Sequence, residues 1–214
     1  MNVLIIGANG QIGKRLVHQL KDSDFTPVAM VRKETQREQF QKENIRTVLA
    51  DLENDISHAF ENIDAVVFTA GSGGHTPKSQ TKVIDENGAK KAIDEAKKSG
   101  VNRFIMISAL KANRDPKSWS ESMQHYYEAK SAADEYLRRS GLDYTILMPG
   151  RLSNDKGDGK VELSMHIDKI KGRLITRDNV ANTVVEIIKK QNTIGKSLEL
   201  LQGETPIEEA VKKI

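Results

Sequence analysis

Two side chains with complementary proton chemistry lie four residues apart, Tyr126 and Lys130. On a helix this spacing places both side chains on one face. A free phenol has a pKa of ~10, and a neighbouring ammonium favours the phenolate and lowers that pKa. The pair therefore predicts a general acid/base that moves a proton to or from a substrate oxygen. In the alternative interpretation Lys130 only binds a cofactor, and Tyr126 only lines the pocket. Tyr127 is adjacent, and one of the two rings could belong to the core.

Three glycines follow a short apolar segment at the start of the chain, spaced as GxxGxxG. The first permits a tight turn, the second lets the backbone approach a pyrophosphate, and the third lets helix and strand pack closely. The helix that follows would offer free N–H groups and a partial positive charge to the phosphates. The segment therefore predicts a dinucleotide site, with these contacts: Gly7, Asn9, Gly10, Gln11, Ile12 and Gly13.

A basic residue, Arg32, stands where the second expected strand ends. A carboxylate at this place accepts from the ribose of NAD, whereas an arginine suits the 2′-phosphate of NADP. We therefore expect NADP, with NAD less favoured, unless Arg32 and Lys33 are only a solvent-facing basic pair. After the third strand, Asp51 could accept from the adenine amino group while Leu52 packs on the base. Asp51 could instead cap a helix.

Short apolar runs alternate with longer amphipathic stretches through most of the chain. Continuous apolar strands alternating with helices predict an α/β fold with a doubly wound parallel sheet, a Rossmann fold. The expected strands are 3–6, 27–31, 47–49, 65–69, 103–107 and 144–148, and the expected helices are 11–20, 36–42, 82–99 and 123–139.

The pattern of apolar and polar residues changes after Pro149, and a polar loop covers residues 153–160. Short strands are expected at 161–163, 174–175 and 197–201. Asp178 could cap a helix that reaches residue 190, and Thr205 a final helix that reaches residue 214. We expect residues 1–214 to form one NAD(P)-binding domain, with 151–214 as a small substrate-side extension that caps the carboxyl edge of the sheet.

The sequence resembles the short-chain dehydrogenase/reductase superfamily, in its atypical, NmrA-like and NAD-dependent epimerase/dehydratase-like branch. The resemblance rests on residues 7–13, Ala70, Gly71, Ser72 and Gly73, Ser108, Tyr126 with Lys130, and Pro149, Gly150, Arg151 and Leu152. It implies that Ser108 hydrogen-bonds the substrate oxygen and that Lys130 also binds the ribose hydroxyls. It further implies that segment 71–74 passes near the pyrophosphate and ribose, and that the loop at 149–152 meets the nicotinamide.

One position departs from the family pattern. The family usually has an asparagine on the central helix, three residues before Gly88, where this chain has Asp85. This residue puts the usual proton relay in question, so two functions stay open. The first is an NADP-dependent oxidoreductase or epimerase/dehydratase-like enzyme for a small carbonyl or hydroxyl compound, since the short C-terminal part argues against a nucleotide sugar. The second is a non-catalytic NADP-binding redox sensor that regulates a protein partner.

The composition and charge of the chain exclude several classes of protein and of binding partner. The chain has no cysteine, and its net charge of +3 comes from 33 basic and 30 acidic residues mixed along the sequence. We therefore expect no disulfide, no nucleic-acid partner and a cytoplasmic location. No apolar run approaches the ~20 residues of a membrane helix. His75 and His125 lack metal-ligand spacing and are expected at the surface, so no metal is predicted.

Three further expectations concern single residues and assembly. Trp119 could be a lid or a local anchor, and Arg177 could meet a substrate carboxylate. By analogy with the wider superfamily, the chain could form a homodimer.

Overall fold

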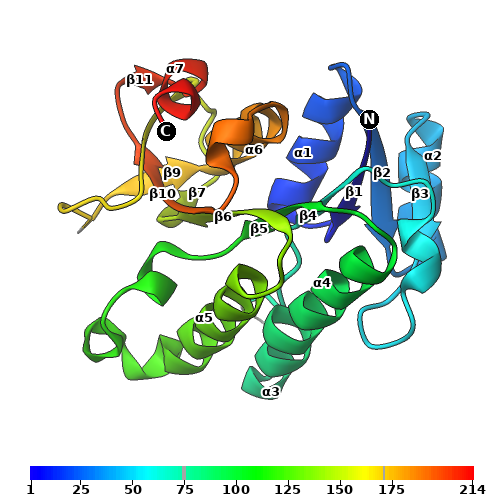
Figure 1. Cartoon of the computed structure of the whole chain (residues 1–214), viewed down its shortest axis with the longest axis horizontal. Coiled ribbons are helices and arrows are strands. Elements are labelled where there is room, and N and C mark those ends of the chain that lie inside the picture. The colour runs from blue at the N-terminus through cyan, green and yellow to red at the C-terminus, as the bar shows by residue number, and fades with distance from the viewer. Residues whose placement is uncertain (74–75, 171) are drawn as a thin grey trace.

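The computed structural model describes residues 1–73, 76–170 and 172–214. Its centre is a nine-stranded sheet with the strand order β11-β8-β10-β6-β5-β4-β1-β2-β3 (Figure 1). The strands are β1 (Asn2–Ile6), β2 (Thr26–Val31), β3 (Arg46–Leu49), β4 (Ala65–Phe68), β5 (Arg103–Ile107), β6 (Asp143–Pro149), β8 (Lys160–Ser164), β10 (Lys196–Gln202) and β11 (Thr205–Pro206).

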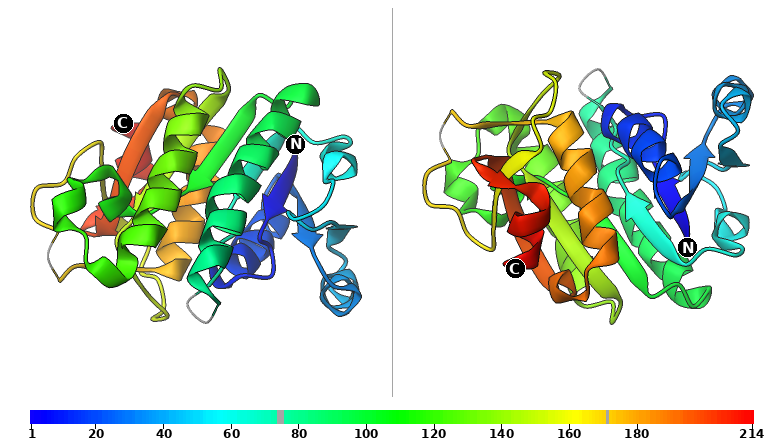
Figure 2. Two further views of the ribbon diagram at one scale, coloured as in Figure 1. Left: turned by 90° about the horizontal axis from the view of Figure 1, so that it is seen from below. Right: turned by 90° about the horizontal axis from the view of Figure 1, so that it is seen from above.

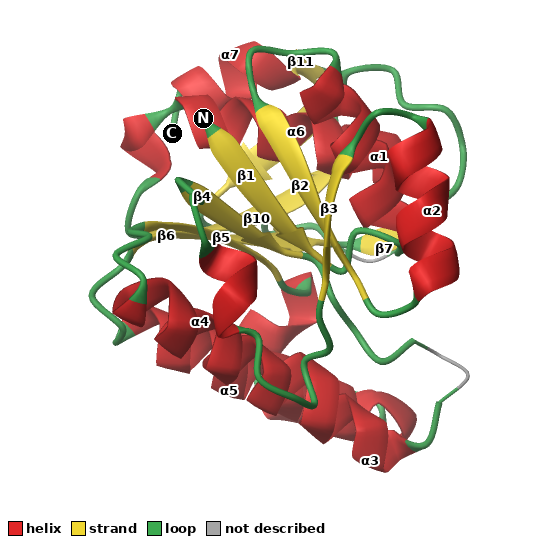
Figure 3. Cartoon of the chain, turned by 90° about the vertical axis from the view of Figure 1, so that its right-hand side faces the viewer, coloured by secondary structure: helices red, strands yellow, loops and turns green. Residues whose placement is uncertain are grey.

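Helices cover both faces of this sheet, as Figures 2 and 3 show. One face packs against α1 (Gln11–Lys21), α2 (Glu34–Lys42), α6 (Arg177–Lys189) and α7 (Ile207–Lys212). The other packs against α4 (Ala89–Lys98) and α5 (Gln124–Arg138). Alternate residues of β1 point to opposite faces of the sheet. Val3 and Ile5 belong to the hydrophobic cluster on one face, and Leu4 and Ile6 belong to the cluster on the other. Burial on both faces explains why the strands are continuously apolar.

The strands from β3 to β6 are parallel to their neighbours, and β10 continues this parallel series beside β6. The predicted doubly wound α/β fold is therefore confirmed. β8 and β11 extend the sheet with antiparallel pairing. β7 (Arg151–Ser153) leaves the end of β6 and pairs with β9 (Leu174–Thr176) in a separate two-stranded sheet. The assignment of 151–214 as a substrate-side extension stays a prediction.

Two expected helix caps are wrong. The N-cap of α6 is Thr176, whose hydroxyl accepts from the N–H of Asn179 at 3.1 Å. Asp178 lies inside the first turn, where it forms an ion pair with Arg15 at 2.6 Å. Thr205 belongs to β11, so α7 begins only at Ile207. In both places a tertiary partner outweighs the local capping preference.

The central helix differs from the expected residues 82–99 in both its start and its geometry. It begins with α3 (Lys78–Thr81), continues as a π-helical segment (Lys82–Gly88) and ends with α4. A π-helical turn has one residue more per hydrogen-bonded ring than an α-helix, and such turns are frequent at functional sites. This segment contains Asp85, the residue that departs from the family pattern.

Within the described part of the chain, no helix combines the length and apolar composition that crossing a membrane requires.

Two glycines at the turn between β1 and α1 have no room for a side chain. Gly7 has a φ of +91°, and a Cβ there would lie 2.6 Å from the backbone N of Ala70. A Cβ on Gly13 would lie 2.2 Å from the carbonyl oxygen of Gly7. The first and third glycines therefore bring the turn, β4 and α1 into direct contact.

We expect Gly13→Ala to lower the free energy of unfolding by about 1–3 kcal/mol, because the methyl group forces α1 away from the turn. The displacement of α1 should also remove the stabilisation that an added dinucleotide gives. Urea unfolding with and without NADP measures both effects. Gly100→Ala is the control, since a Cβ there meets nothing within 4 Å and should cost only conformational strain. A Gly13→Ala protein that is still fully stabilised by NADP would contradict this role.

Candidate functional site

A cleft of about 1090 Å³ lies at the carboxyl ends of the parallel strands. It includes the point between β1 and β4 where the strand order reverses, which is where open α/β sheets bind ligands. Its lining comes from the glycine turn, the ends of β2, β4, β5 and β6, the central helix and the start of α5. Among the sequence-predicted residues it contains Gly7, Asn9, Gly10, Gln11, Ile12, Arg32, Leu52, Ala70, Gly71, Ser72, Ser108, Tyr126, Lys130, Pro149 and Leu152.

The glycine turn fits a phosphate group. The N-cap of α1 is Gly10, which has no side chain to cap the helix, and the first turn contains no acidic residue. The free N–H groups at this end therefore face the cleft without a side-chain acceptor. Asn9 adds a buried Oδ1 that has no hydrogen-bond partner among the described residues. An anion with hydroxyl neighbours, such as a dinucleotide pyrophosphate, satisfies both features.

The basic residue at the end of β2 lies on the rim of this cleft. Arg32 is exposed, and the described residues give its guanidinium no ion pair or hydrogen bond. Gln36 fixes the backbone here, since its Oε1 accepts from the N–H groups of Arg32 at 3.1 Å and Lys33 at 3.2 Å. The guanidinium is therefore available to a ligand.

After β3, Leu52 lines the cleft, whereas Asp51 is not among its lining residues. The Oδ1 of Asp51 accepts from the N–H of Glu53 at 3.0 Å and closes a turn. No helix starts there, so the alternative that Asp51 caps a helix is wrong.

The tyrosine and lysine of α5 lie together at the opposite end of the cleft. Lys130 is almost fully buried, and its Nζ lies 5.9 Å from the centre of the Tyr126 ring. The same Nζ donates to the carbonyl oxygen of Ile107 at 3.3 Å and forms an ion pair with Asp85 Oδ1 at 3.3 Å. The helix spacing and the end of β5 together bring this cation to the cleft.

Asp85 connects three elements of the site. Its Oδ2 accepts from the backbone N–H of Ser72 at 2.9 Å, and its Oδ1 faces Lys130. A Cβ on Gly71 would lie 3.1 Å from this carboxylate. The aspartate therefore holds the loop after β4 against α5 and gives Lys130 a charge partner. Gly74 and His75, which follow this loop, lie outside the described residues.

The expected lowering of the tyrosine pKa is wrong for the protein alone. Burial raises the pKa of Tyr126, and the lowering effect of Lys130 does not offset it, because Asp85 and Asp134 also raise it. Burial lowers the pKa of Lys130, but Tyr126, Asp85 and Asp134 raise it by more. The site without ligand therefore holds a neutral phenol beside a charged ammonium.

Ser108 is buried at the end of β5 and lines the cleft. Its hydroxyl lies 2.6 Å from Oδ2 of Asp134, a residue that the sequence analysis missed. Burial raises the pKa of Asp134 to about 6, although the Ser108 hydrogen bond and Lys130 lower it. Asp134 follows Lys130 by four residues, so the two side chains share a helix face. That spacing could have indicated Asp134, but it does not show that the carboxyl group is buried.

The expectation that His125 is a surface residue is also wrong. It is half-buried and lines the cleft, and its Nδ1 is buried without a partner among the described residues. Helix periodicity alone could not place it, because the cleft wall there is completed by other elements.

The loop after β6 divides between the cleft and the core. Pro149 and Leu152 line the cleft. Gly150 packs on β10, where a Cβ would lie 2.3 Å from Cδ2 of Leu201. Arg151 is exposed on β7. Arg177, from the start of α6, lines the cleft and donates to Oδ1 of Asn154 at 3.1 Å.

Trp119 is a local anchor, and it is not among the residues that line the cleft. Its Nε1 donates to the carbonyl oxygen of Lys111 at 2.7 Å, and its ring lies 5.6 Å from that of Tyr127. Tyr127 also contacts Tyr126 edge to face at 5.4 Å. Tyr127 therefore supports the segment before α5, and Tyr126 is the ring that lines the cleft.

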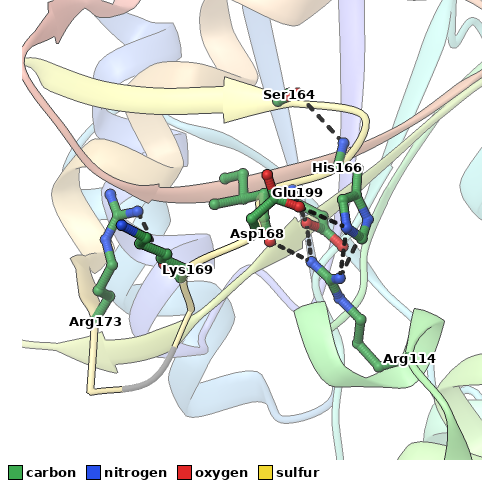
Figure 4. A network of polar contacts seen from close by, with 8 residues as sticks. Arg114, Ser164, His166, Asp168, Lys169, Arg173 and Glu199 are labelled. Carbon is green, nitrogen blue, oxygen red and sulfur yellow. Dashed lines mark hydrogen bonds and ion pairs between the residues drawn. The ribbon is translucent and has the colours of Figure 1, made fainter.

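An ionic network around Arg114 and Glu199 also anchors the segment before α5 (Figure 4). Arg114 forms an ion pair of 2.5 Å with Glu199, which is fully buried on β10. The guanidinium also donates to the carbonyl oxygen of Ile167, and the carboxylate accepts from the N–H of the same residue. The segments around residues 114 and 167 are thereby tied to the sheet.

The comparisons with known proteins agree with this geometry. The model of a family described as NAD(P)H-binding matches residues 7–191. The uncharacterized sugar epimerase YhfK of Bacillus subtilis (strain 168) is 45% identical, with 100% of both chains covered. A structure from Bacillus halodurans, named as a proposed NAD-dependent epimerase/dehydratase, is 47% identical with a TM-score of 0.96 and 100% of both chains covered. The oxidoreductase ylbE from Lactococcus lactis is 30% identical with a TM-score of 0.88, covering 100% of this chain and 96% of that one.

The resemblance drawn from the glycine turn and the Tyr126–Lys130 pair is therefore confirmed. The protein belongs to the NAD(P)H-binding Rossmann family of epimerase- and oxidoreductase-like proteins, and it is homologous to the sugar epimerase YhfK.

Proposed function

We propose that the protein is an NADP-dependent oxidoreductase or epimerase/dehydratase-like enzyme that acts on a small carbonyl or hydroxyl compound. One observation supports this most strongly: a single cleft joins the uncapped helix end at Gly10 to the half-buried Tyr126 and the buried Lys130. A dinucleotide that places its phosphates at the turn extends toward the tyrosine. The pair is then positioned to serve the oxygen of a reacting substrate.

In this proposal the reduced dinucleotide supplies a hydride, and the chain supplies the proton and its placement. The neutral Tyr126 phenol donates its proton to the carbonyl oxygen as that oxygen becomes an alcohol. Lys130 stabilises the phenolate left behind, because its ammonium is fixed close to the ring. Asp85 and the carbonyl oxygen of Ile107 keep Lys130 in that position. In the reverse direction, Tyr126 takes the proton from an alcohol.

The test is NADPH oxidation measured against a panel of aldehydes, ketones, quinones and simple sugars. The sugars belong in the panel because the Bacillus subtilis relative is named a sugar epimerase. Turnover of at least one compound is expected. Tight NADP binding without turnover, together with a change in affinity for a partner protein, would replace the enzyme proposal by the redox-sensor alternative.

Arg32 supports NADP as the cofactor, because its exposed guanidinium on the cleft rim has no partner among the described residues. A ligand at about 100 times its Kd adds roughly 2.7 kcal/mol of stability. We therefore expect NADP to raise the melting temperature more than NAD does, and Arg32→Asp to erase or invert that order. Thermal unfolding with each dinucleotide measures the difference.

The matched control is Lys33→Asp, which makes the same charge change at the next residue, whose side chain does not line the cleft. It should keep the preference for NADP. Equal stabilisation of the parent by NAD and NADP would remove the NADP assignment and leave the fold and the family unaffected.

A further inference from the structure

Three charged side chains form one buried cluster beneath the proposed reaction site. Lys130 is 4% exposed, and Asp85 and Asp134 are each 1% exposed. One cation therefore acts on two carboxyl groups in a place with little access to water, and it forms an ion pair with Asp85 and a longer-range interaction with Asp134. Burying an ion without full compensation costs several kcal/mol. The cluster is electrically balanced only when one of the two carboxyl groups carries a proton.

The contact with Lys130 distinguishes the two carboxyl groups. Asp85 accepts from the N–H of Ser72, and its Oδ1, which has no hydrogen-bond partner among the described residues, forms an ion pair with Lys130 at 3.3 Å. Asp134 has only the hydroxyl of Ser108 at 2.6 Å, and its Oδ1 has no partner among the described residues. An ionised oxygen with neither a donor nor a cation in contact with it is poorly stabilised in the interior. Asp134 is therefore the carboxyl group that holds the proton more readily.

Among the described residues, the ionisable and polar groups that act on Asp134 come from three elements. Tyr126, Lys130 and Arg138 lie on its own helix, Ser108 lies at the end of β5, and Asp85 acts across the shared ammonium from the π-helical segment. Lys130 and Arg138 favour the carboxylate, and burial opposes it. The net effect places the pKa of Asp134 at about 6, within the range in which a cell or an assay can change its state.

Resting on the proposed function, we propose that Asp134 is a positioning residue that sets the direction of the Ser108 hydroxyl. A neutral Asp134 donates to Ser108 Oγ, which leaves the Ser108 proton free to hydrogen-bond a substrate carbonyl oxygen. An ionised Asp134 accepts that proton, so Ser108 can only accept, as from a substrate alcohol. The protonated state thus favours binding of a carbonyl and the ionised state favours binding of an alcohol. Neither residue loses or gains a proton in the reaction itself.

The first test needs no substrate. Infrared titration in D2O between pH 4 and 9 should show the C=O band of one neutral carboxyl group that disappears well above the ~4 of an ordinary aspartate. The band should be absent in Asp134→Asn and shifted to higher frequency in Ser108→Ala, where it loses its partner. Asp178→Asn is the control and should leave the band unchanged. A band that persists in Asp134→Asn, or the absence of any neutral carboxyl above pH 5, would overturn the proposal.

Asp85→Asn tests the charge balance with Asp134 intact. Without the carboxylate of Asp85, Lys130 interacts with Asp134 as its one remaining carboxyl partner in the cluster. The titration midpoint of Asp134 should therefore fall by about one pH unit or more. An unchanged midpoint would overturn the argument. This variant also keeps the proposal testable if Asp134→Asn does not fold.

The second test uses any carbonyl that the panel identifies. In the parent, kcat/KM for reduction should fall as the pH rises through the infrared midpoint. Asp134→Asn should remove this fall, because its amide Nδ2 donates to Ser108 at every pH, whereas Asp134→Leu should be slow throughout. A parent profile that survives in Asp134→Asn would overturn the proposal. If no carbonyl is reduced, the proposed function fails, and the infrared titration still decides the state of Asp134.

Discussion

Replacing Tyr126 by phenylalanine is expected to lower kcat/KM for carbonyl reduction by about 10²–10⁴-fold, because general acid catalysis contributes about that much. The ring would still fill the same place in the cleft wall, so NADP binding should stay within a few fold of the parent. Steady-state NADPH oxidation measures the rate, and thermal unfolding with NADP measures the binding. The separation of the two effects distinguishes a proton donor from a wall residue.

Tyr127→Phe is the matched control for this prediction. Tyr127 is adjacent, but its ring packs against Trp119 and is not part of the cleft lining. Its turnover should equal that of the parent. If Tyr126→Phe keeps parental turnover, or if Tyr127→Phe loses as much, then Tyr126 is not the acid, and His125 on the same cleft becomes the group to replace next.

Replacing Lys130 by methionine is expected to lower the free energy of unfolding at pH 7 by about 3–5 kcal/mol, which is the usual cost of leaving a buried charge without its partner. Methionine preserves most of the apolar stem, so the loss comes mainly from the ammonium. Asp85 then loses its ion pair, and Asp134 loses a charge that lowers its pKa. Urea unfolding at pH 7 measures the change.

The pH dependence of this loss follows from the sign of the Asp134 shift. Its pKa of about 6 in the folded protein lies above the 3.8 of an ordinary aspartate, so the stability it contributes is complete below about pH 4 and is lost as the pH rises through 6. Without Lys130 the folded pKa rises further. The Lys130→Met protein should therefore be closest to the parent under acidic conditions and furthest from it above neutrality.

Lys98→Met is the control for an exposed ion pair. Lys98 pairs with Glu95 at 2.7 Å, but 70% of its side chain is exposed, so its removal should change the free energy of unfolding very little. If Lys130→Met lowered the free energy of unfolding just as little, and by the same amount at every pH, then the stability of the buried cluster would not depend on its cation. Lys130→Met should also lose most of the stabilisation by NADP, because the family resemblance assigns the ribose contact to this lysine.

Local patterns in the sequence determined the fold and the dinucleotide end of the cleft. The spacing of Gly7, Gly10 and Gly13 between an apolar strand and a helix constrains the backbone directly, because a Cβ on Gly7 would collide with Ala70 and a Cβ on Gly13 with the backbone of the turn. Strand–helix alternation required a parallel sheet covered on both faces. The four-residue spacing of Tyr126 and Lys130 put the two side chains on one helix face, whatever packs against it.

Tertiary structure alone decided the electrostatics of the reaction site. Ser108 and Asp134 are 26 residues apart in sequence, and Asp85 reaches Lys130 only because the π-helical segment packs against α5. The sequence predicted a lowered tyrosine pKa beside the lysine, but in the protein without a cofactor desolvation and two buried carboxyl groups raise that pKa. Burial, and therefore the charge state of a polar side chain, depends on which distant segments meet around it. A local sequence pattern specifies which side chains share one face of a helix or strand. The packed fold determines which side chains from other elements contact that face.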